Sequence, residues 1–328
     1  MRQKPLRDLI IYCDRASNTA RELAIRLNCR RLYSSANRGL RRNDGALVVN
    51  YGTSHSPNFS LGNKSAVLNP PEVVKRAISK RVAYEAFKSH GVPTLDFTVQ
   101  RDVATKWLQD GCGVLCRRDG LSGGKGINFV PKGSQDCPNA DFYTKYFAKT
   151  HEYRAHVVNG KLIDLTQKKL QNGHAKGDSE NSVSRIVRSL DNGWIHAHEF
   201  DVSSTARKAI EHAAVSAIQS LGLDFGAVDI LVKYPKGGIT APVLAVCEVN
   251  TAPGLGNEVT LNAYVEAFKA KYGSTVQSRA VSLPPVRRKR VRRMVEVFVT
   301  TRKGNRVKRL RERLVYEDTG ELVMRASK

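Results

Sequence analysis

An acidic residue and an amide stand two positions apart on an apolar segment, 246–250. Because side chains alternate between the faces of a β-strand, Glu248 and Asn250 share one face. Oxygen-bearing side chains are costly to bury unless a cation meets them, and Mg2+ takes oxygen ligands that it usually shares with phosphates. A second apolar segment, 226–232, carries Asp229, and a loop with turn residues separates the two. We predict that the segments pair and that Asp229, Glu248 and Asn250 hold a divalent ion; a hairpin with outward-facing polar groups is the alternative.

A glycine-rich segment, 117–126, lies between two short predicted strands. It fails the P-loop pattern, because three residues separate Gly120 from Gly124 and Gly126 stands where that pattern has Ser or Thr. Glycines nevertheless let backbone N–H groups approach phosphate oxygens closely, and Lys125 adds a positive charge. The segment therefore predicts a flexible phosphate-binding loop, with a plain hairpin turn as the alternative.

The elements that must position these groups begin with a small α/β unit. A strand over 9–13, a helix over 18–28 and a strand over 46–52 predict a parallel βαβ arrangement. We assign 1–68 to this N-terminal α/β domain. A helix is then predicted from the two prolines at 70 and 71 to about residue 90, since apolar residues recur at every fourth position.

Short strands and helices alternate through the next part of the chain. Asn159-Gly160 predicts a type I′ hairpin turn, and the alanine-rich segment 204–221 predicts a helix with a serine cap. We expect one domain over 69–275. It divides into a glycine-loop subdomain, about 92–145, and a metal-binding subdomain, about 146–275.

Positive charge is the unusual bulk feature of the chain. It has 54 Lys and Arg against 30 Asp and Glu, a net charge of +24, and 281–328 alone contain 15 basic and 5 acidic residues. We predict a basic C-terminal extension with β-like segments over 276–328. Its stretch 287–313 would make weak, salt-dependent contact with nucleic acid or an acidic protein, although only Phe298 and Tyr316 could stack on bases. The alternatives are a solvated extension or packing on a neighbouring subunit of a homo-oligomer.

Composition excludes several classes of protein. The 328 residues are 41% apolar, which is typical of a globular protein, and no stretch approaches the roughly 20 apolar residues of a membrane span. The first residues lack the apolar core of a secretory signal. The six cysteines are scattered without the spacing of a zinc site, so we expect reduced thiols. These observations predict a cytoplasmic protein, in the host cytoplasm if the source is a virus, without a membrane partner.

Taken in chain order, the motifs resemble the ATP-grasp superfamily of carboxylate–amine ligases. The likeness is to the branch with glutathione synthetase, D-alanine–D-alanine ligase and the ribosomal-protein glutamate ligases, and it covers about 60–272. Its most specific motif is an acid-x-Asn followed by Thr-x-Pro-Gly, at 248–254. The other motifs are Asn69-Pro70-Pro71 leading to Lys80, 114–117 before the glycine loop, 143–146 before 152–154, and 226–229. The resemblance implies an α/β (α+β) ATP-grasp fold that binds ATP and Mg2+, or Mn2+.

The resemblance also implies roles for individual residues. It makes Asp229, Glu248 and Asn250 the metal ligands. It makes Arg154, Lys168 and Lys169 the catalytic cations near the γ-phosphate and the acyl-phosphate, with the assignment between the two lysines left open. Around the nucleotide it places two cations, Lys80 and Arg117, and the glycine loop with Gly123, Gly124, Lys125 and Gly126. The adenine hinge would be Thr144, Lys145, Tyr146 and Phe147, and the acid that binds the ribose would be Glu152. Many relatives carry lysine where Arg117 stands, and arginine keeps that charge but changes its geometry.

The function that the resemblance implies is an ATP- and Mg2+-dependent ligase. It would activate a carboxylate as an acyl-phosphate, which an amine attacks to give an amide, ADP and phosphate. The amine acceptor would be an amino acid, a peptide or a protein; the sequence identifies neither substrate. The alternatives are a protein that binds nucleic acid or acidic proteins through its basic extension, and an ATP-grasp kinase that phosphorylates a hydroxyl.

Overall fold

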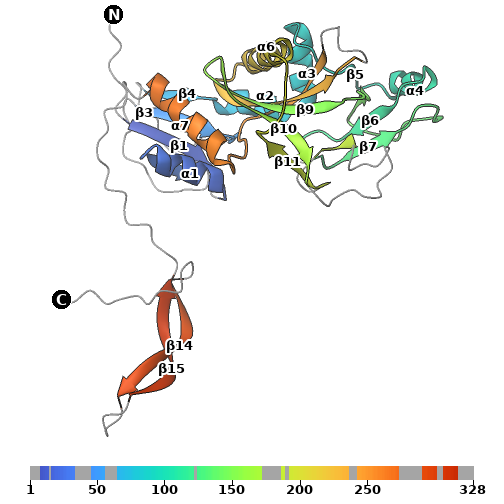
Figure 1. Ribbon diagram of the computed structural model, residues 1–328. Helices are drawn as coiled ribbons and strands as arrows, with labels where there is room; N and C mark the ends of the chain where they lie inside the picture. Colours follow the sequence, from blue (N-terminus) through green and yellow to red (C-terminus); the bar gives the residue numbers. More distant parts are fainter. Residues whose placement is uncertain are drawn as a thin grey trace, which may run out of the picture. The chain divides into compact units, whose positions relative to one another are not determined.

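The computed structural model describes residues 8–14, 16–33, 46–55, 65–121, 124–171, 186–188, 192–235, 242–272, 290–300 and 306–316 (Figure 1). The chain divides into two compact units, Met1–Ser278 and Arg279–Lys328. Within the described residues, none of the helices combines the length and the apolar character that crossing a membrane requires.

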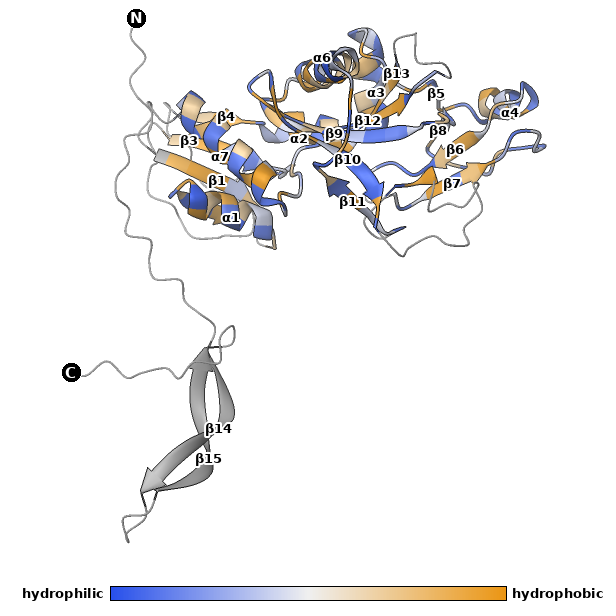
Figure 2. Cartoon of the chain, viewed as in Figure 1, coloured by the Kyte–Doolittle hydropathy of each residue, from blue (hydrophilic) through white to orange (hydrophobic). Residues whose placement is uncertain are grey.

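The first unit begins with a four-stranded parallel sheet in the order β2-β1-β3-β4. Its elements are β1 (Asp8–Cys13), α1 (Asn18–Arg26), β2 (Arg30–Tyr33), β3 (Ala46–Tyr51) and β4 (Ala66–Leu68). The predicted parallel βαβ arrangement is confirmed, whereas β2 and β4 were not predicted. β1 is largely hydrophobic (Figure 2), and β3 is buried along its whole length. Both faces of this sheet are therefore covered, as is usual for parallel strands.

The single helix predicted over 70–90 is wrong, because the chain forms two helices there, α2 (Pro71–Ile78) and α3 (Lys80–Ser89). Ser79 between them is extended, with φ −75° and ψ 107°. Its Oγ donates to Asp119 Oδ2 (2.6 Å), and Lys80 N donates to Asp119 Oδ1 (2.8 Å). A carboxylate from the glycine loop thus satisfies a backbone N–H that the start of a helix leaves free.

A second, antiparallel sheet of four strands has the order β5-β8-β6-β7. Its elements are β5 (Phe97–Thr98), α4 (Arg101–Gln109), β6 (Val114–Arg117), β7 (Ile127–Val130) and β8 (Phe142–Lys145). The glycine-rich segment joins β6 to β7, which pair antiparallel as predicted. α4 packs on this sheet, with Ala104 and Leu108 fully buried.

A third sheet, β11-β10-β9-β12-β13, is antiparallel throughout. Its elements are β9 (His151–Val158), β10 (Lys161–Leu170), β11 (Trp194–Ala197), α6 (Ser204–Leu221), β12 (Phe225–Lys233) and β13 (Val243–Asn250). Asn159 and Gly160 both have positive φ, 50° and 71°, which confirms the predicted hairpin turn between β9 and β10. α6 has the predicted bounds and its cap from Ser203, and it packs on β9, β12 and β13.

The last helix of the first unit, α7 (Glu258–Tyr272), contacts both α1 and the β9–β10 pair. One apolar cluster runs from Leu23 and Leu47 through Tyr264 and Phe268 to Phe225. The parallel sheet and the end of the third sheet therefore share a core. The second unit is described by itself: β14 (Arg290–Thr300) and β15 (Arg306–Tyr316) form an antiparallel two-stranded ribbon.

Candidate active site

A cavity of about 290 Å³ lies between the third sheet and the glycine loop. Its wall comes from α3, β6, β7, β9, β10, β11, β12 and β13 and from the segment that follows β8. Part of the lining is apolar: Leu95, Leu115, Ile127, Phe147 and Leu231. The remainder includes a dense set of charged side chains. A flat apolar ligand part and a polyanionic part would both find suitable surroundings in such a cavity.

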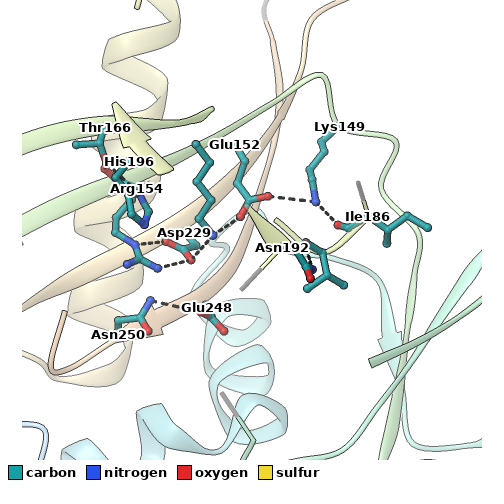
Figure 3. A network of polar contacts seen from close by, with 12 residues as sticks. Lys149, Glu152, Arg154, Thr166, Ile186, Asn192, His196, Asp229, Glu248 and Asn250 are labelled. Carbon is teal, nitrogen blue, oxygen red and sulfur yellow. Dashed lines mark hydrogen bonds and ion pairs between the residues drawn. The ribbon is translucent and has the colours of Figure 1, made fainter. Parts of the chain in front are cut away.

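The three predicted metal ligands lie on paired strands. β12 and β13 pair as predicted, and their register sets Asp229 directly opposite Glu248, with an irregularity just after Asp229. Asn250 follows two residues later, and its Nδ2 donates to Glu248 Oε1 (3.4 Å; Figure 3). All three line the cavity.

This donor set is oxygen-only and incomplete for a metal by itself. Within the described ranges, no three His, Cys, Asp or Glu side chains are grouped so that they could hold an ion. Two carboxylates and an amide fit Mg2+, which prefers oxygen and completes its shell with phosphates and water. They do not fit a zinc site, which would use nitrogen or sulfur.

Asp229 is held by two cations inside the cavity. Arg154, its register partner on β9, donates from Nε to Oδ1 (2.6 Å) and from Nη2 to Oδ2 (2.8 Å). Lys168 Nζ donates to the same Oδ2 (3.0 Å), and Asp229 is only 2% exposed. Burial acts to raise the pKa of Asp229, but the charges of Arg154 and Lys168 outweigh it and hold that pKa far below its usual range.

Glu152 extends this pairing toward Lys149, in the segment between β8 and β9. Lys168 Nζ also donates to Glu152 Oε1 (2.5 Å), and Lys149 Nζ lies 3.1 Å from Glu152 Oε2. We call the series Lys149–Glu152–Lys168–Asp229–Arg154 the charge chain (Figure 3). Burial acts to raise the pKa of Glu152, and the two lysines reverse that effect and lower it. Positive and negative groups thus alternate along the cavity wall.

Two further cations border the cavity. Lys80, the first residue of α3, donates from Nζ to the Leu121 carbonyl (2.5 Å) and lies 3.7 Å from Glu248 Oε2. Arg117 at the end of β6 is 4% exposed, and its Nε donates to Thr144 Oγ1 (3.1 Å). Buried arginine needs such partners, because a guanidinium does not lose its proton in proteins.

The glycine loop comes close to the opposite wall at Gly124. A Cβ on Gly124 would lie 2.2 Å from a methyl carbon of Val187, and its φ is +79°. Space and backbone conformation therefore both require glycine at this position.

The sequence matches no family model and no curated protein. Solved structures resemble it, however. D-alanine–D-alanine ligase from Bacillus anthracis aligns with a TM-score of 0.54 at 13% identity, over 82% of this chain and 96% of that one. D-alanyl-alanine synthetase A from Vibrio cholerae gives 0.55 at 13% identity, over 84% and 99%. The ATP-grasp ligase PsnB, complexed with a minimal precursor, Mg and ADP, gives 0.54 at 11% identity, over 80% and 97%.

The fold is that of the ATP-grasp ligases. The predicted fold class is confirmed by this likeness.

Most residues that the sequence suggested for an ATP-grasp site do line the cavity: Lys80, Arg117, Gly124, Lys125, Tyr146, Phe147, Glu152, Arg154, Lys168, Asp229, Glu248 and Asn250. Gly123 lies outside the described residues. Four others are not part of the lining: Gly126, Thr144, Lys145 and Lys169. The structure thus brings charged side chains of the β9–β10 pair and of the β12–β13 pair into one cavity.

The residues outside the lining have other contacts. Thr144 is fully buried and accepts the hydrogen bond from Arg117, whereas Lys145 pairs with Asp96 at 2.9 Å. Lys169 donates to the Glu199 carbonyl. Lys168 and Lys169 are adjacent on β10 and so face opposite ways, and it is Lys168 that lines the cavity.

Sequence reasoning missed several polar groups that line this cavity, among them Lys149 and His196. Lys149 is 8% exposed and also donates to the Ile186 carbonyl (2.7 Å). His196 on β11 is the register partner of Lys168, and its Nδ1 lies 3.4 Å from Thr166 Oγ1. Burial and then the charge of Arg154 lower the pKa of His196 to about 4, so the ring is neutral at pH 7. No strand was predicted over β11, and its short irregular sequence offers no signal for one.

Proposed function

We propose that the protein is an ATP- and Mg2+-dependent ligase that joins a carboxylate to an amine through an acyl-phosphate. The observation that carries this proposal is the position of Asp229. One buried carboxylate lies opposite the acid of the acid-x-Asn motif and is also bonded to two cations. Asp229 would therefore serve as a metal ligand and also position the two cations, Arg154 and Lys168, that would bind phosphate.

Nucleotide binding would exchange the partners of these charges. Asp229, Glu248 and Asn250 would hold the ion, and Mg2+ would supply neutralisation of phosphate charge when bound. Arg154, Lys168 and Lys80 would turn from carboxylates to phosphate oxygens. Buried charges stay paired in both states, so neither state leaves an isolated charge in the interior.

The apolar part of the cavity lining is a suitable position for the adenine base of ATP. Tyr146 and Phe147 follow β8, next to Leu95, Leu115 and Leu231, in the part of the sequence that resembles an adenine hinge. Glu152 already forms ion pairs with two lysines. It would keep these pairs and accept hydrogen bonds from the ribose hydroxyls in addition.

The chemistry then proceeds in two balanced steps. A carboxylate oxygen of the substrate attacks the γ-phosphorus, the P–O bond to ADP breaks, and ADP leaves with the electron pair. The amine nitrogen next attacks the acyl carbon, a C–N bond forms, and phosphate leaves as the C–O bond breaks. The cations of the charge chain would stabilise the transferred phosphoryl group, whose charge is spread over its oxygens. An acceptor that arrives as an ammonium loses two protons, of which one goes to the departing phosphate and the other to solvent.

The solved neighbours favour amino acids and peptides as substrate classes. One of the similar proteins is named a D-alanine–D-alanine ligase and another a D-alanyl-alanine synthetase, and PsnB was solved with a minimal precursor. For this chain we propose an amino acid or a peptide as the carboxylate, and an amino acid, peptide or protein amine as the acceptor.

The test is ATP turnover with a panel of amino acids and acidic peptides, with hydroxylamine as a trapping nucleophile. An acyl-phosphate yields a hydroxamate, whereas a phosphorylated hydroxyl does not, so the trap separates a ligase from a kinase. Glu248→Ala should abolish ADP release, and Asp96→Ala, which changes an exposed pair outside the cavity, should not. MgADP binding is measured in parallel, so a missing substrate is not mistaken for a missing nucleotide site. ADP release that survives Glu248→Ala would refute the proposal.

A further inference from the structure

The β14–β15 ribbon has a regular register that sorts its residues onto two faces. Eleven consecutive residues of β14 pair with eleven of β15, from Arg290 opposite Tyr316 to Thr300 opposite Arg306, without an interruption. Alternate residues of a strand belong to opposite faces. Because odd numbers pair with odd numbers, the odd-numbered residues make one face, which we call the odd face, and the even-numbered residues make the other.

The odd face has an unusual composition. It consists of six valines and four arginines, namely Arg293, Arg309, Arg311 and Arg313. Both acidic residues of the ribbon, Glu296 and Glu312, belong to the even face together with four basic residues. The odd face therefore carries +4 and the even face +2, and all the negative charge is on one side.

The register also sets like charges against each other. Arg293 stands directly opposite Arg313. Like charges at directly opposed positions destabilise a strand pair, and a two-stranded ribbon is marginally stable by itself. An anion bound at the odd face would remove this repulsion, so the ribbon and an anionic partner stabilise each other.

We propose that the odd face binds the phosphate backbone of duplex DNA, with the ribbon lying in the major groove. That groove admits a two-stranded β-ribbon, whereas the deep, narrow major groove of duplex RNA does not. Alternate residues of a strand are about 6.8 Å apart, so one row of side chains presents cations at an even repeat, as a phosphate backbone presents anions. The row Arg309, Arg311 and Arg313 follows this spacing, and arginine binds phosphate as a two-pronged donor.

Other occupants fit these features less well. A second copy of the chain would bring its own odd face with the same charge, and the whole chain carries +24. An acidic protein supplies negative charge without a fixed repeat along one line. The proposed arginine contacts are to phosphates, which carry no sequence information, so binding that does not depend on base sequence is expected. The proposal stands independently of the ligase chemistry in the first unit.

The experiment measures binding of a short fluorescent DNA duplex to the full chain by anisotropy, at several salt concentrations. The odd triple is Arg309→Gln, Arg311→Gln and Arg313→Gln. The matched even triple is Arg292→Gln, Arg306→Gln and Lys308→Gln, which removes the same net charge from the other face. The odd triple should weaken binding about tenfold or more and reduce the slope of log K against log salt by about 3, whereas the even triple should change both far less.

A third variant separates loss of contact from loss of folding. Arg309→Lys, Arg311→Lys and Arg313→Lys keeps the charge and should keep the salt slope while weakening binding modestly. An unchanged urea unfolding transition, followed by circular dichroism, shows that the first unit is intact in each variant. Equal losses for the odd and even triples, or competition by poly-glutamate as effective as by unlabelled DNA, would overturn the proposal, since either result means a response to net charge alone. A single-stranded probe that binds as tightly as the duplex would also overturn it.

Discussion

The cavity of the first unit and the ribbon of the second both concentrate basic residues, but they arrange opposite charges differently. In the cavity, cations and acids alternate along the charge chain, at distances from 2.5 to 3.1 Å. In the ribbon, the arginines of the odd face are separated from both acids, and Arg293 is set opposite Arg313. The cavity contains the partners of its charges, whereas strand alternation assigns both acids of the ribbon to the face opposite the odd-face arginines.

The difference follows from burial. A charge inside a fold must be balanced before any ligand arrives, because an unpaired buried ion costs several kcal/mol. A two-stranded ribbon has no interior that imposes this requirement. A ligand of the cavity must therefore exchange partners with side chains that are already paired.

The largest expected effect comes from breaking the charge chain at its most buried acid. Asp229→Ala leaves Arg154 and Lys168, whose side chains are 15% and 10% exposed, without this partner. Removing one partner of a buried ion pair costs about 3–5 kcal/mol of unfolding free energy. Urea denaturation followed by circular dichroism measures this loss. Asp96→Ala breaks a pair whose acid is 69% exposed and should cost less than about 1 kcal/mol. Equal losses for the two variants would show that burial does not distinguish the charge chain from a surface pair.

A smaller effect should appear when the pH is lowered. His156 on β9 is 2% exposed, and burial followed by the charge of Arg154 lowers its pKa to about 3. The groups around it include Asp164, His196 and Asp229. Below about pH 6.5 the unfolded chain binds a proton at this histidine and the folded chain does not, so stability falls with pH until the folded pKa is reached.

The expected cost from His156 is about 2 kcal/mol between pH 7 and pH 5, at about 1.4 kcal/mol per pH unit below 6.5. Denaturation midpoints at the two pH values measure it. His156→Gln should reduce this dependence by about that amount and leave the part due to His196, whose pKa is also lowered by burial, whereas His212→Gln, on the exposed side of α6, should leave the dependence unchanged. An unchanged slope in His156→Gln would place the acid sensitivity elsewhere.

The smallest of these effects concerns the contact between the glycine loop and α3. Asp119 accepts hydrogen bonds from Ser79 Oγ and Lys80 N, so it fixes the start of the helix that presents Lys80 to the cavity. Asp119→Ala should weaken MgADP binding about tenfold, the equivalent of roughly 1.4 kcal/mol. Isothermal titration calorimetry measures the change. Glu85→Ala, an exposed change on the same helix, is the control. Identical MgADP affinities for the two variants would show that the Asp119 contact does not determine the position of Lys80.

Local patterns predicted many of the elements and some strand pairings, but not most of the contacts between elements distant in sequence. The parallel βαβ start, the turn at Asn159-Gly160 and the pairing of β12 with β13 follow from periodicity and turn chemistry, which are local. The break between the two helices at Ser79 could not be predicted in this way. Ser79 bonds to Asp119, which is 40 residues away, and the apolar period continues across Ser79. The choice between Lys168 and Lys169 depends on which face of β10 meets the cavity, and only tertiary packing decides that.

Some residues of the candidate site could likewise be predicted from local patterns, and others could not. The acid-x-Asn motif identified Glu248 and Asn250 because strand alternation alone puts them together. The pairing of Glu152 with two lysines depends on β9 and β10 lying side by side and on the loop after β8. His196 enters through β11, whose place in the sheet no local pattern indicates.

The most direct test of the account is MgADP binding by calorimetry, with and without EDTA, for the wild-type chain and for Glu248→Gln. If the carboxylates of the cavity exchange side-chain cations for a metal–nucleotide complex, the wild type binds ADP tightly only with Mg2+, and Glu248→Gln loses most of that metal dependence. An affinity for ADP that is the same with Mg2+, with EDTA and in Glu248→Gln would contradict the account.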